Sequence, residues 1–184
     1  LGSRADLNLI VNGISAYKKV IIWMPTYRQS TCASSANDGK AYEFGIPLID
    51  SKNIIILDRL LKINNIFLLI KFHALQDKQR ELGMELTNIK VITTKDITKT
   101  GKSLYRFVGQ CDALISDYSS IYFEYMSLNR PLCFAYDDLE EYKTKRGFMF
   151  DDVVSIMPGY HADNFEKLCE FINDISNNID KFSS

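Results

Sequence analysis

The sequence predicts an α/β fold, a Rossmann-like and mostly parallel sheet with helices on both faces. Short continuous apolar runs occupy residues 20–24, 66–70, 113–115 and 132–134, and residues 89–93 form a further strand-like segment. Such runs have the length and composition of strands buried on both faces. Segments with helical periodicity separate them, as in successive βαβ units. We therefore expect four or five parallel strands whose carboxyl ends lie along one edge of the sheet.

Composition restricts the classes of partner. The 184 residues fit one domain, and 46% hydrophobic with 24% charged residues is typical of a soluble protein. A net charge of -1 gives no basic surface, so we expect no nucleic-acid partner. No apolar run approaches the ~20 residues that span a bilayer. The chain begins with Leu1 and not Met, so we expect it to be part of a longer protein.

The cysteines predict free thiols and not a metal site. No CxxC pair occurs among Cys32, Cys111, Cys133 and Cys169, and their spacing matches no zinc pattern. Cys111 and Cys133 lie in or beside apolar strands, where a thiol packs as a small hydrophobic group. We expect buried thiols and a reducing compartment.

The chain divides into an entry segment, one domain and a tail. We expect residues 1–17 to form an interdomain linker and an entry helix over 7–17, residues 18–175 the domain, and 176–184 a polar tail. After the strand at 20–24, Pro25 ends the pairing and Arg28 reaches the carboxyl edge. There its guanidinium is suited to clamp phosphate oxygens, and a plain surface arginine is the alternative. Residues 29–50 are a long loop of small polar residues, often functional or mobile.

The second strand carries another basic pair. A helix capped by Asp50 or Ser51 and ending near residue 63 precedes the strand at 66–70, and Lys71 and His73 follow it. The two share a face of an extended chain. His73 is a candidate general acid or base or a phosphate ligand, and a capping or core histidine is the alternative. Further helices are expected at 76–86 and 103–110, around the strand at 89–93 and a loop at 93–96.

Residues 112–136 contain the central motif, predicted as strand 113–115, turn 116–120, helix 121–128 and a strand from 132. Ser119 and Ser120 lie where the strand meets the helix, beside unpaired N–H groups that suit a phosphate or diphosphate. Glu124 lies one turn below Ser120, where a carboxylate suits neutral hydroxyls such as those of ribose. The alternative is that Asp117 and Ser119 only cap the helix, and the two interpretations are compatible.

The remainder predicts a loop at 135–138, a short charged helix at 139–145 ended by Gly147, a turn at 155–159, and a helix at 165–175 capped by Asp163 or Asn164. Three strand ends thus carry polar side chains that can converge on one ligand in a parallel sheet. The sequence has no GxGxxG and no Walker A motif, which argues against a dinucleotide oxidoreductase or a P-loop NTPase.

These motifs together resemble those of the CDP-glycerol glycerophosphotransferase family, the wall teichoic acid primases and polymerases. The segment DALISDYSS (112–120) is close to the family pattern Asp-x-Leu-Ile-Thr-Asp-Tyr-Ser-Ser, and PTYR (25–28) matches Pro-Thr-aromatic-Arg. KFHA (71–74) matches Lys-x-His-Pro except at Ala74, and LGSRAD (1–6) resembles Gly-x-Pro-Arg-x-Asp, with Ser3 in place of the Pro. The two departures leave room for a different donor, such as CDP-ribitol. The last block, Tyr-Asp…Tyr…Arg-Gly, corresponds to residues 136–147.

The resemblance implies the nucleotide-binding, C-terminal half of a GT-B type glycosyltransferase. Arg28, Ser119 and Ser120 would hold the diphosphate of a CDP-alcohol, and Glu124 the ribose. Lys71 and His73 would reach phosphate or glycerol, with His73 also a candidate catalytic residue. The remaining implied binding residues are Ile92, Thr93 and Thr94 beside the cytosine, and Asp117 and Arg146 from the matched motifs.

The implied reaction is attack of an acceptor hydroxyl on the β-phosphate of CDP-glycerol with release of CMP, driven by positioning and charge neutralisation. The acceptor would be a teichoic-acid-like polymer or lipid-linked molecule held by an N-terminal half, which would also supply the general base. The isolated chain should therefore bind nucleotide but turn over little. No metal or other cofactor is expected. The longer protein is expected in the cytoplasm, at the inner face of the membrane.

Two alternatives remain open. One is a transferase of the same architecture that uses CDP-ribitol or a sugar nucleotide. The other is a non-catalytic α/β module that docks a protein partner. The sequence leaves open primase against polymerase activity and the oligomeric state.

Overall fold

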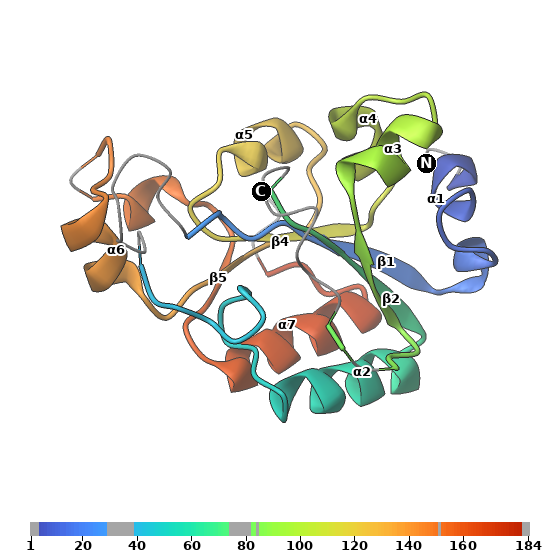
Figure 1. Ribbon diagram of the computed structural model, residues 1–184, viewed down its shortest axis with the longest axis horizontal. Coiled ribbons are helices and arrows are strands. Elements are labelled where there is room, and N and C mark those ends of the chain that lie inside the picture. Colours follow the sequence, from blue (N-terminus) through green and yellow to red (C-terminus); the bar gives the residue numbers. More distant parts are fainter. Residues whose placement is uncertain (1–3, 29–38, 74–81, 84, 151, 182–184) are drawn as a thin grey trace.

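The computed structural model describes residues 4–28, 39–73, 82–83, 85–150 and 152–181. Six strands form one sheet in the order β3-β2-β1-β4-β5-β6, and every neighbouring pair is parallel (Figure 1). The strands are β1 (Lys19–Trp23), β2 (Ile66–Lys71), β3 (Ile89–Ile92), β4 (Ala113–Ser116), β5 (Leu132–Ala135) and β6 (Tyr160–Ala162). The predicted α/β, Rossmann-like fold is confirmed.

Two apolar layers sandwich the sheet. In β1, Ile21 and Trp23 point into a cluster with the helices α2 (Asn53–Ile63) and α7 (Phe165–Ser176). Val20 and Ile22 point into the opposite cluster, which includes α4 (Leu104–Val108) and α5 (Ile121–Met126). Figure 1 shows α2 and α7 on one face and α3 (Thr94–Lys99), α4 and α5 on the other. This alternation follows from the two-residue period of a strand and explains why the strands read as continuous apolar runs.

Several predicted elements match the structure closely. The last helix is α7, and its N-cap residue Asn164 accepts a hydrogen bond from the Lys167 N–H. Asp50 accepts bonds from the backbone at the start of α2. The charged helix α6 (Leu139–Lys145) follows β5 as expected. Cys111 and Cys133 are free and buried, as predicted, whereas Cys32 lies outside the described residues.

Other predictions were wrong. The entry helix expected over 7–17 is two short elements, α1 (Ala5–Asn8) and η1 (Ile14–Ala16), because Gly13 takes a left-handed φ of 78° between them. Leu7 and Ile14 are nonetheless fully buried against the domain. The expected loop after β3 is the start of α3, because Thr93 and Asp96 form a capping box.

Two further differences concern a strand that was not predicted and the end of an expected helix. The sixth strand, β6, follows the short η3 (Val154–Ile156) and was not predicted, because its three residues are too few and too polar to form an apolar run. Most of the helix expected at 76–86 lies outside the described residues, and residues 82–83 and 85–86 are not helical.

Within the described ranges, no helix has the length and apolar character needed to cross a membrane.

Candidate functional site

The site lies where the strand order reverses. The chain runs outward from β1 through β2 to β3, then returns to β4 beside β1 and runs outward again. In such sheets ligands bind at the carboxyl ends of the two strands flanking the reversal. The segments after β1 and β4 are joined there: the Met24 N–H donates to the Ile115 carbonyl at 2.8 Å, and the Thr26 N–H donates to the Asp117 carboxylate at 2.9 Å. Thus the structure brings two of the predicted motifs together.

Asp117 connects these two segments from a fully buried position. Its carboxylate accepts hydrogen bonds from the N–H and the hydroxyl of Thr26, and it lies 2.9 Å from an Nη atom of Arg28. Ser120, and not Asp117 or Ser119, is the N-cap residue of α5, and its side chain makes no cap hydrogen bond. The interpretation of Asp117 and Ser119 as simple helix caps was therefore wrong.

Ser119 and Ser120 form the exposed part of the turn. The Ser119 side chain is half-buried and that of Ser120 is exposed. Neither hydroxyl makes a hydrogen bond within the part of the chain that the structure describes. Two hydroxyls without an internal partner, beside the first turn of α5, can accept or donate to a ligand without breaking any bond in the fold.

Arg28 is not open to the edge of the sheet as its sequence position suggested. It is only 6% exposed; its Nε lies 2.9 Å from Asp138, and its guanidinium also pairs with Asp117. The Cζ atom lies 5.1 Å from the centres of both the Tyr118 and the Tyr142 rings. Burial lowers the pKa of Arg28, but the two carboxylates outweigh it and raise the pKa, so the cation is permanent. A phosphate contact by Arg28 stays a prediction and requires it to release a carboxylate.

Asp138 is a site residue that the sequence analysis missed. It is 4% exposed and accepts hydrogen bonds from Arg28, from the Tyr118 hydroxyl at 3.0 Å and from the Lys40 N–H at 3.2 Å. Burial, and then the charge of Asp138, raise the pKa of Tyr118, so its hydroxyl remains a donor. The available signal was an acidic pair, Asp137 and Asp138, directly after a buried strand.

The end of β2 lies beside β1. Lys71 is 5% exposed and its Nζ donates to the Phe72 carbonyl, whereas His73 is exposed. The His73 ring stacks on Tyr27, with ring centroids 5.8 Å apart and 26° between the planes. The structure therefore connects His73 to the segment that leads into Arg28.

The other predicted residues are spread along the same edge. Ile92 is buried at the end of β3, and Thr93 uses its N–H and hydroxyl within the capping box of α3. Thr94 is exposed in the first turn of that helix. Glu124 is exposed on α5 and Arg146 is exposed at the end of α6. Their predicted contacts with a nucleotide stay predictions.

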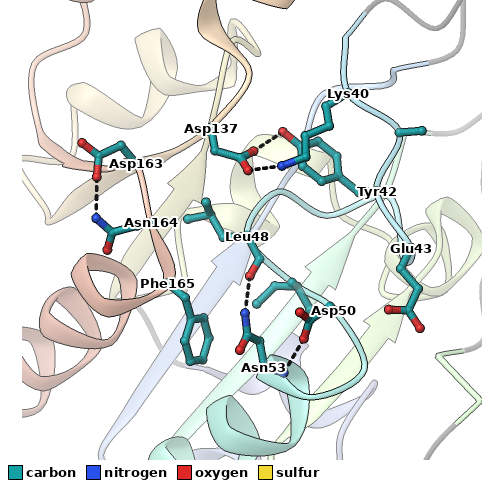
Figure 2. Close-up of a pocket in the computed structure, with 12 residues that line it drawn as sticks. Lys40, Tyr42, Glu43, Leu48, Asp50, Asn53, Asp137, Asp163, Asn164 and Phe165 are labelled. Carbon is teal, nitrogen blue, oxygen red and sulfur yellow. Dashed lines mark hydrogen bonds and ion pairs between the residues drawn. The ribbon is translucent and has the colours of Figure 1, made fainter.

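A cleft of about 400 Å³ lies where the segments after β5 and β6 meet the start of α2 (Figure 2). Its wall includes residues 40–43 and 48–50, the end of the long loop predicted from composition, together with Asp137 and the start of α7. Figure 2 shows Asp137 bonded to both Lys40 and Tyr42. None of the binding or catalytic residues predicted from sequence lines this cleft.

Comparison with known proteins identifies the family. The profile of the family described as CDP-Glycerol:Poly(glycerophosphate) glycerophosphotransferase matches residues 8–183. The chain is 30% identical over 161 residues to the teichoic acid glycerol-phosphate primase of Bacillus subtilis, covering 86% of this chain and 35% of that protein. It is 31% identical over 173 residues to the teichoic acid poly(glycerol phosphate) polymerase of Bacillus spizizenii, covering 90% and 38%. It is 29% identical over 164 residues to the ribitol-phosphate polymerase TarL of Staphylococcus aureus, covering 85% and 25%.

The solved structures agree on the fold. The wall teichoic acid polymerase TagF aligns with a TM-score of 0.60 at 24% identity, over 94% of this chain and 38% of that chain. The chain thus spans about a quarter to two fifths of these relatives. The family resemblance seen in the motifs is confirmed, because the profile covers nearly every residue. This chain belongs to the CDP-glycerol:poly(glycerophosphate) glycerophosphotransferase family.

Proposed function

We propose that this chain is the donor-binding domain of a transferase that moves glycerol phosphate from CDP-glycerol to a hydroxyl of a teichoic-acid-like polymer or a lipid-linked acceptor, with release of CMP. Family membership supports the reaction class. The observation that carries the assignment to this domain is the turn at Ser119 and Ser120, with its two unengaged hydroxyls at the strand reversal. The diphosphate would lie on this turn.

The remaining contacts extend from that position. Glu124, exposed in the first turn of α5, would accept hydrogen bonds from the ribose hydroxyls. His73 and Arg146 are exposed and would donate to phosphate or glycerol oxygens. Lys71 would reach the same group by moving its Nζ from the Phe72 carbonyl. The Thr93 N–H is already bonded to Asp96, so the cytosine edge would depend on the other polar groups at residues 92–94.

The reaction is a substitution at phosphorus. The acceptor oxygen forms a bond to the β-phosphorus of CDP-glycerol, the bond from that phosphorus to the bridging oxygen breaks, and CMP leaves with the electron pair. The acceptor proton passes to a general base from another domain of the longer protein. This domain would hold the donor in line and balance its charge, and alone it should turn over little. We place the longer protein in the cytoplasm, at the inner face of the membrane where a lipid-linked acceptor would be.

CDP-ribitol is the second candidate donor. The relatives include ribitol-phosphate polymerases as well as glycerol-phosphate enzymes, at similar identity. The diphosphate and cytidine contacts would be the same for both donors, so only the alcohol end distinguishes them.

Calorimetric titration of the chain with CDP-glycerol, CDP-ribitol, CDP, CMP, UDP-sugars and GDP-sugars tests the proposal. We expect saturable binding of a CDP-alcohol that is lost in the double variant Ser119→Ala/Ser120→Ala. Ser127→Ala is the matched control, since Ser127 is an exposed serine at the far end of α5. Binding of UDP- or GDP-sugars in preference to CDP-alcohols would point to a sugar-nucleotide transferase. No nucleotide binding by the folded chain would contradict the assignment and leave a docking module.

A further inference from the structure

Three chain segments that are distant in sequence meet at the Asp138 carboxylate. Arg28 comes from the segment after β1, Tyr118 from the turn after β4, and Lys40 from the long loop before α2. Asp138 itself precedes α6. Every one of these partners is a donor, and the side chain of Asp138 is fully buried, so its charge is balanced by these contacts and not by water.

From this position Asp138 controls both residues that precede the two serines. It holds Tyr118 directly through the phenol hydroxyl at 3.0 Å. It holds Asp117 through Arg28, whose guanidinium lies 2.9 Å from each of the two carboxylates. The backbone at 117–118 is therefore fixed at two adjacent points, and the placement of Ser119 and Ser120 follows from it.

The close approach of the loop at Gly39 reinforces this arrangement. A Cβ atom at residue 39 would lie 2.5 Å from an Oδ atom of Asp138 and 3.1 Å from the Cδ atom of Arg28. Only a residue without a side chain leaves both groups in place and lets the Lys40 N–H reach Asp138. The backbone at Gly39 and Lys40 thus lies directly against the Arg28–Asp138 pair.

We infer that Asp138 is a positioning residue for the donor: it acts through Arg28 and Tyr118 to hold the Ser119–Ser120 turn in the conformation that accepts the diphosphate. The inference rests on the proposed function. Arg28 then contributes by bridging two buried carboxylates, while the exposed hydroxyls contact the ligand. The Arg28 guanidinium and its two carboxylate partners, Asp117 and Asp138, together carry a net charge of about -1. This charge is unfavourable for a direct contact between Arg28 and phosphate.

The test compares Asp138→Asn with Asp137→Asn in the whole 184-residue chain. Asp137 is the adjacent carboxylate; it is bonded to Lys40 and Tyr42 and makes no ion pair with Arg28. We expect Asp138→Asn to weaken CDP-glycerol binding by roughly 10- to 100-fold, since ligand recognition requires placement of the contacting groups to within about 0.5 to 1 Å. Asp137→Asn should bind as the unmodified chain does.

Two readouts separate positioning from general destabilisation. In a double-mutant cycle with the single variant Ser119→Ala, which keeps the Ser120 hydroxyl, the Asp138→Asn effect should be clearly smaller than in the unmodified chain, because both changes act on the same contact. Amide hydrogen exchange at residues 117–121 should accelerate in Asp138→Asn while exchange in α7 stays unchanged. If Asp138→Asn does not fold, Tyr118→Phe removes one donor only and should weaken binding about 5-fold.

The outcomes are distinct. The positioning role would be overturned by additive effects in the cycle or by unchanged exchange at residues 117–121. It would also be overturned if Asp138→Asn bound CDP-glycerol at full strength. Where Asp138→Asn does not fold, full-strength binding by Tyr118→Phe would overturn it. If the unmodified chain binds no CDP-alcohol, the proposed function fails. The exchange measurement then still decides whether Asp138 holds the turn.

Discussion

Tyr27 and His73 stack on each other at the ends of the neighbouring strands β1 and β2, with ring centroids 5.8 Å apart. The two residues belong to separate motifs, 46 positions apart by their numbering (73 − 27). The stack fixes the plane of an exposed imidazole beside the segment that leads into Arg28. It gives a direct route to test the role of His73.

We predict that His73→Gln weakens binding of CDP-glycerol about 10-fold, as expected for loss of one charged hydrogen bond. Because His73 is exposed, the free energy of unfolding of the His73→Gln variant should hardly differ from that of the unmodified chain. Tyr27→Ala should weaken CDP-glycerol binding about 3- to 5-fold, because the His73 ring loses the aromatic ring on which it stacks. Tyr27→Phe should leave binding unchanged, since the aromatic contact remains. Calorimetric titration measures both effects. Wild-type affinity in His73→Gln and Tyr27→Ala alike would remove His73 from the site.

We predict that Arg28→Met lowers the free energy of unfolding by about 3–5 kcal/mol, because it leaves two buried carboxylates, Asp117 and Asp138, without their cation. Arg28→Lys should recover little of this loss, since one ammonium group does not reproduce the bridging geometry of a guanidinium. Urea denaturation followed by circular dichroism gives the values.

Arg59→Met on the exposed face of α2 is the control for loss of an arginine, and it should stay within about 0.5 kcal/mol. A loss in Arg28→Met no larger than the one in this control would show that the buried pairs contribute nothing net to folding.

The capping box of α3 predicts a pH-dependent contribution to stability. Burial opposes ionisation of Asp96, but the hydrogen bonds from Thr93 and the charge of Lys99 outweigh it and hold the pKa of Asp96 below its ordinary value. A carboxylate with a lowered folded-state pKa stabilises the fold above its unfolded pKa and loses this contribution as the pH falls through the folded value.

Asp96→Asn should therefore be less stable than the unmodified chain at pH 7, and the difference should shrink as the pH falls below about 4, near the unfolded value for an aspartate. Thr93→Ala, which removes the cap hydroxyl, should cost about 1 kcal/mol at pH 7. Thermal unfolding at a series of pH values measures both. A stability difference for Asp96→Asn that persists unchanged at pH 3 would argue against the ionised capping box.

Local sequence patterns were sufficient for much of the fold. Apolar runs and the strand-like segment at 89–93 marked five of the six strands, and Asn164 marked the start of α7. They failed where the pattern was weak or ambiguous. The three residues of β6 are held by the parallel neighbour β5 and not by their own composition. At Thr93 the local signal of a capping box was present, but the polar residues after the strand were interpreted as a loop.

The sequence by itself determined which residues are candidates for the chemistry of the site, and it placed all of them after strands: the Asp117–Ser120 turn, Lys71 and His73, and Arg28. Only the tertiary structure decided how they are arranged. Whether Arg28 faces a ligand or a carboxylate depends on which strands are neighbours, and the strand order brings it to Asp138, 110 positions away in the chain. Local patterns report burial and periodicity, because these depend on near neighbours in sequence. The partners of a buried charge depend on strand order, which no local pattern contains.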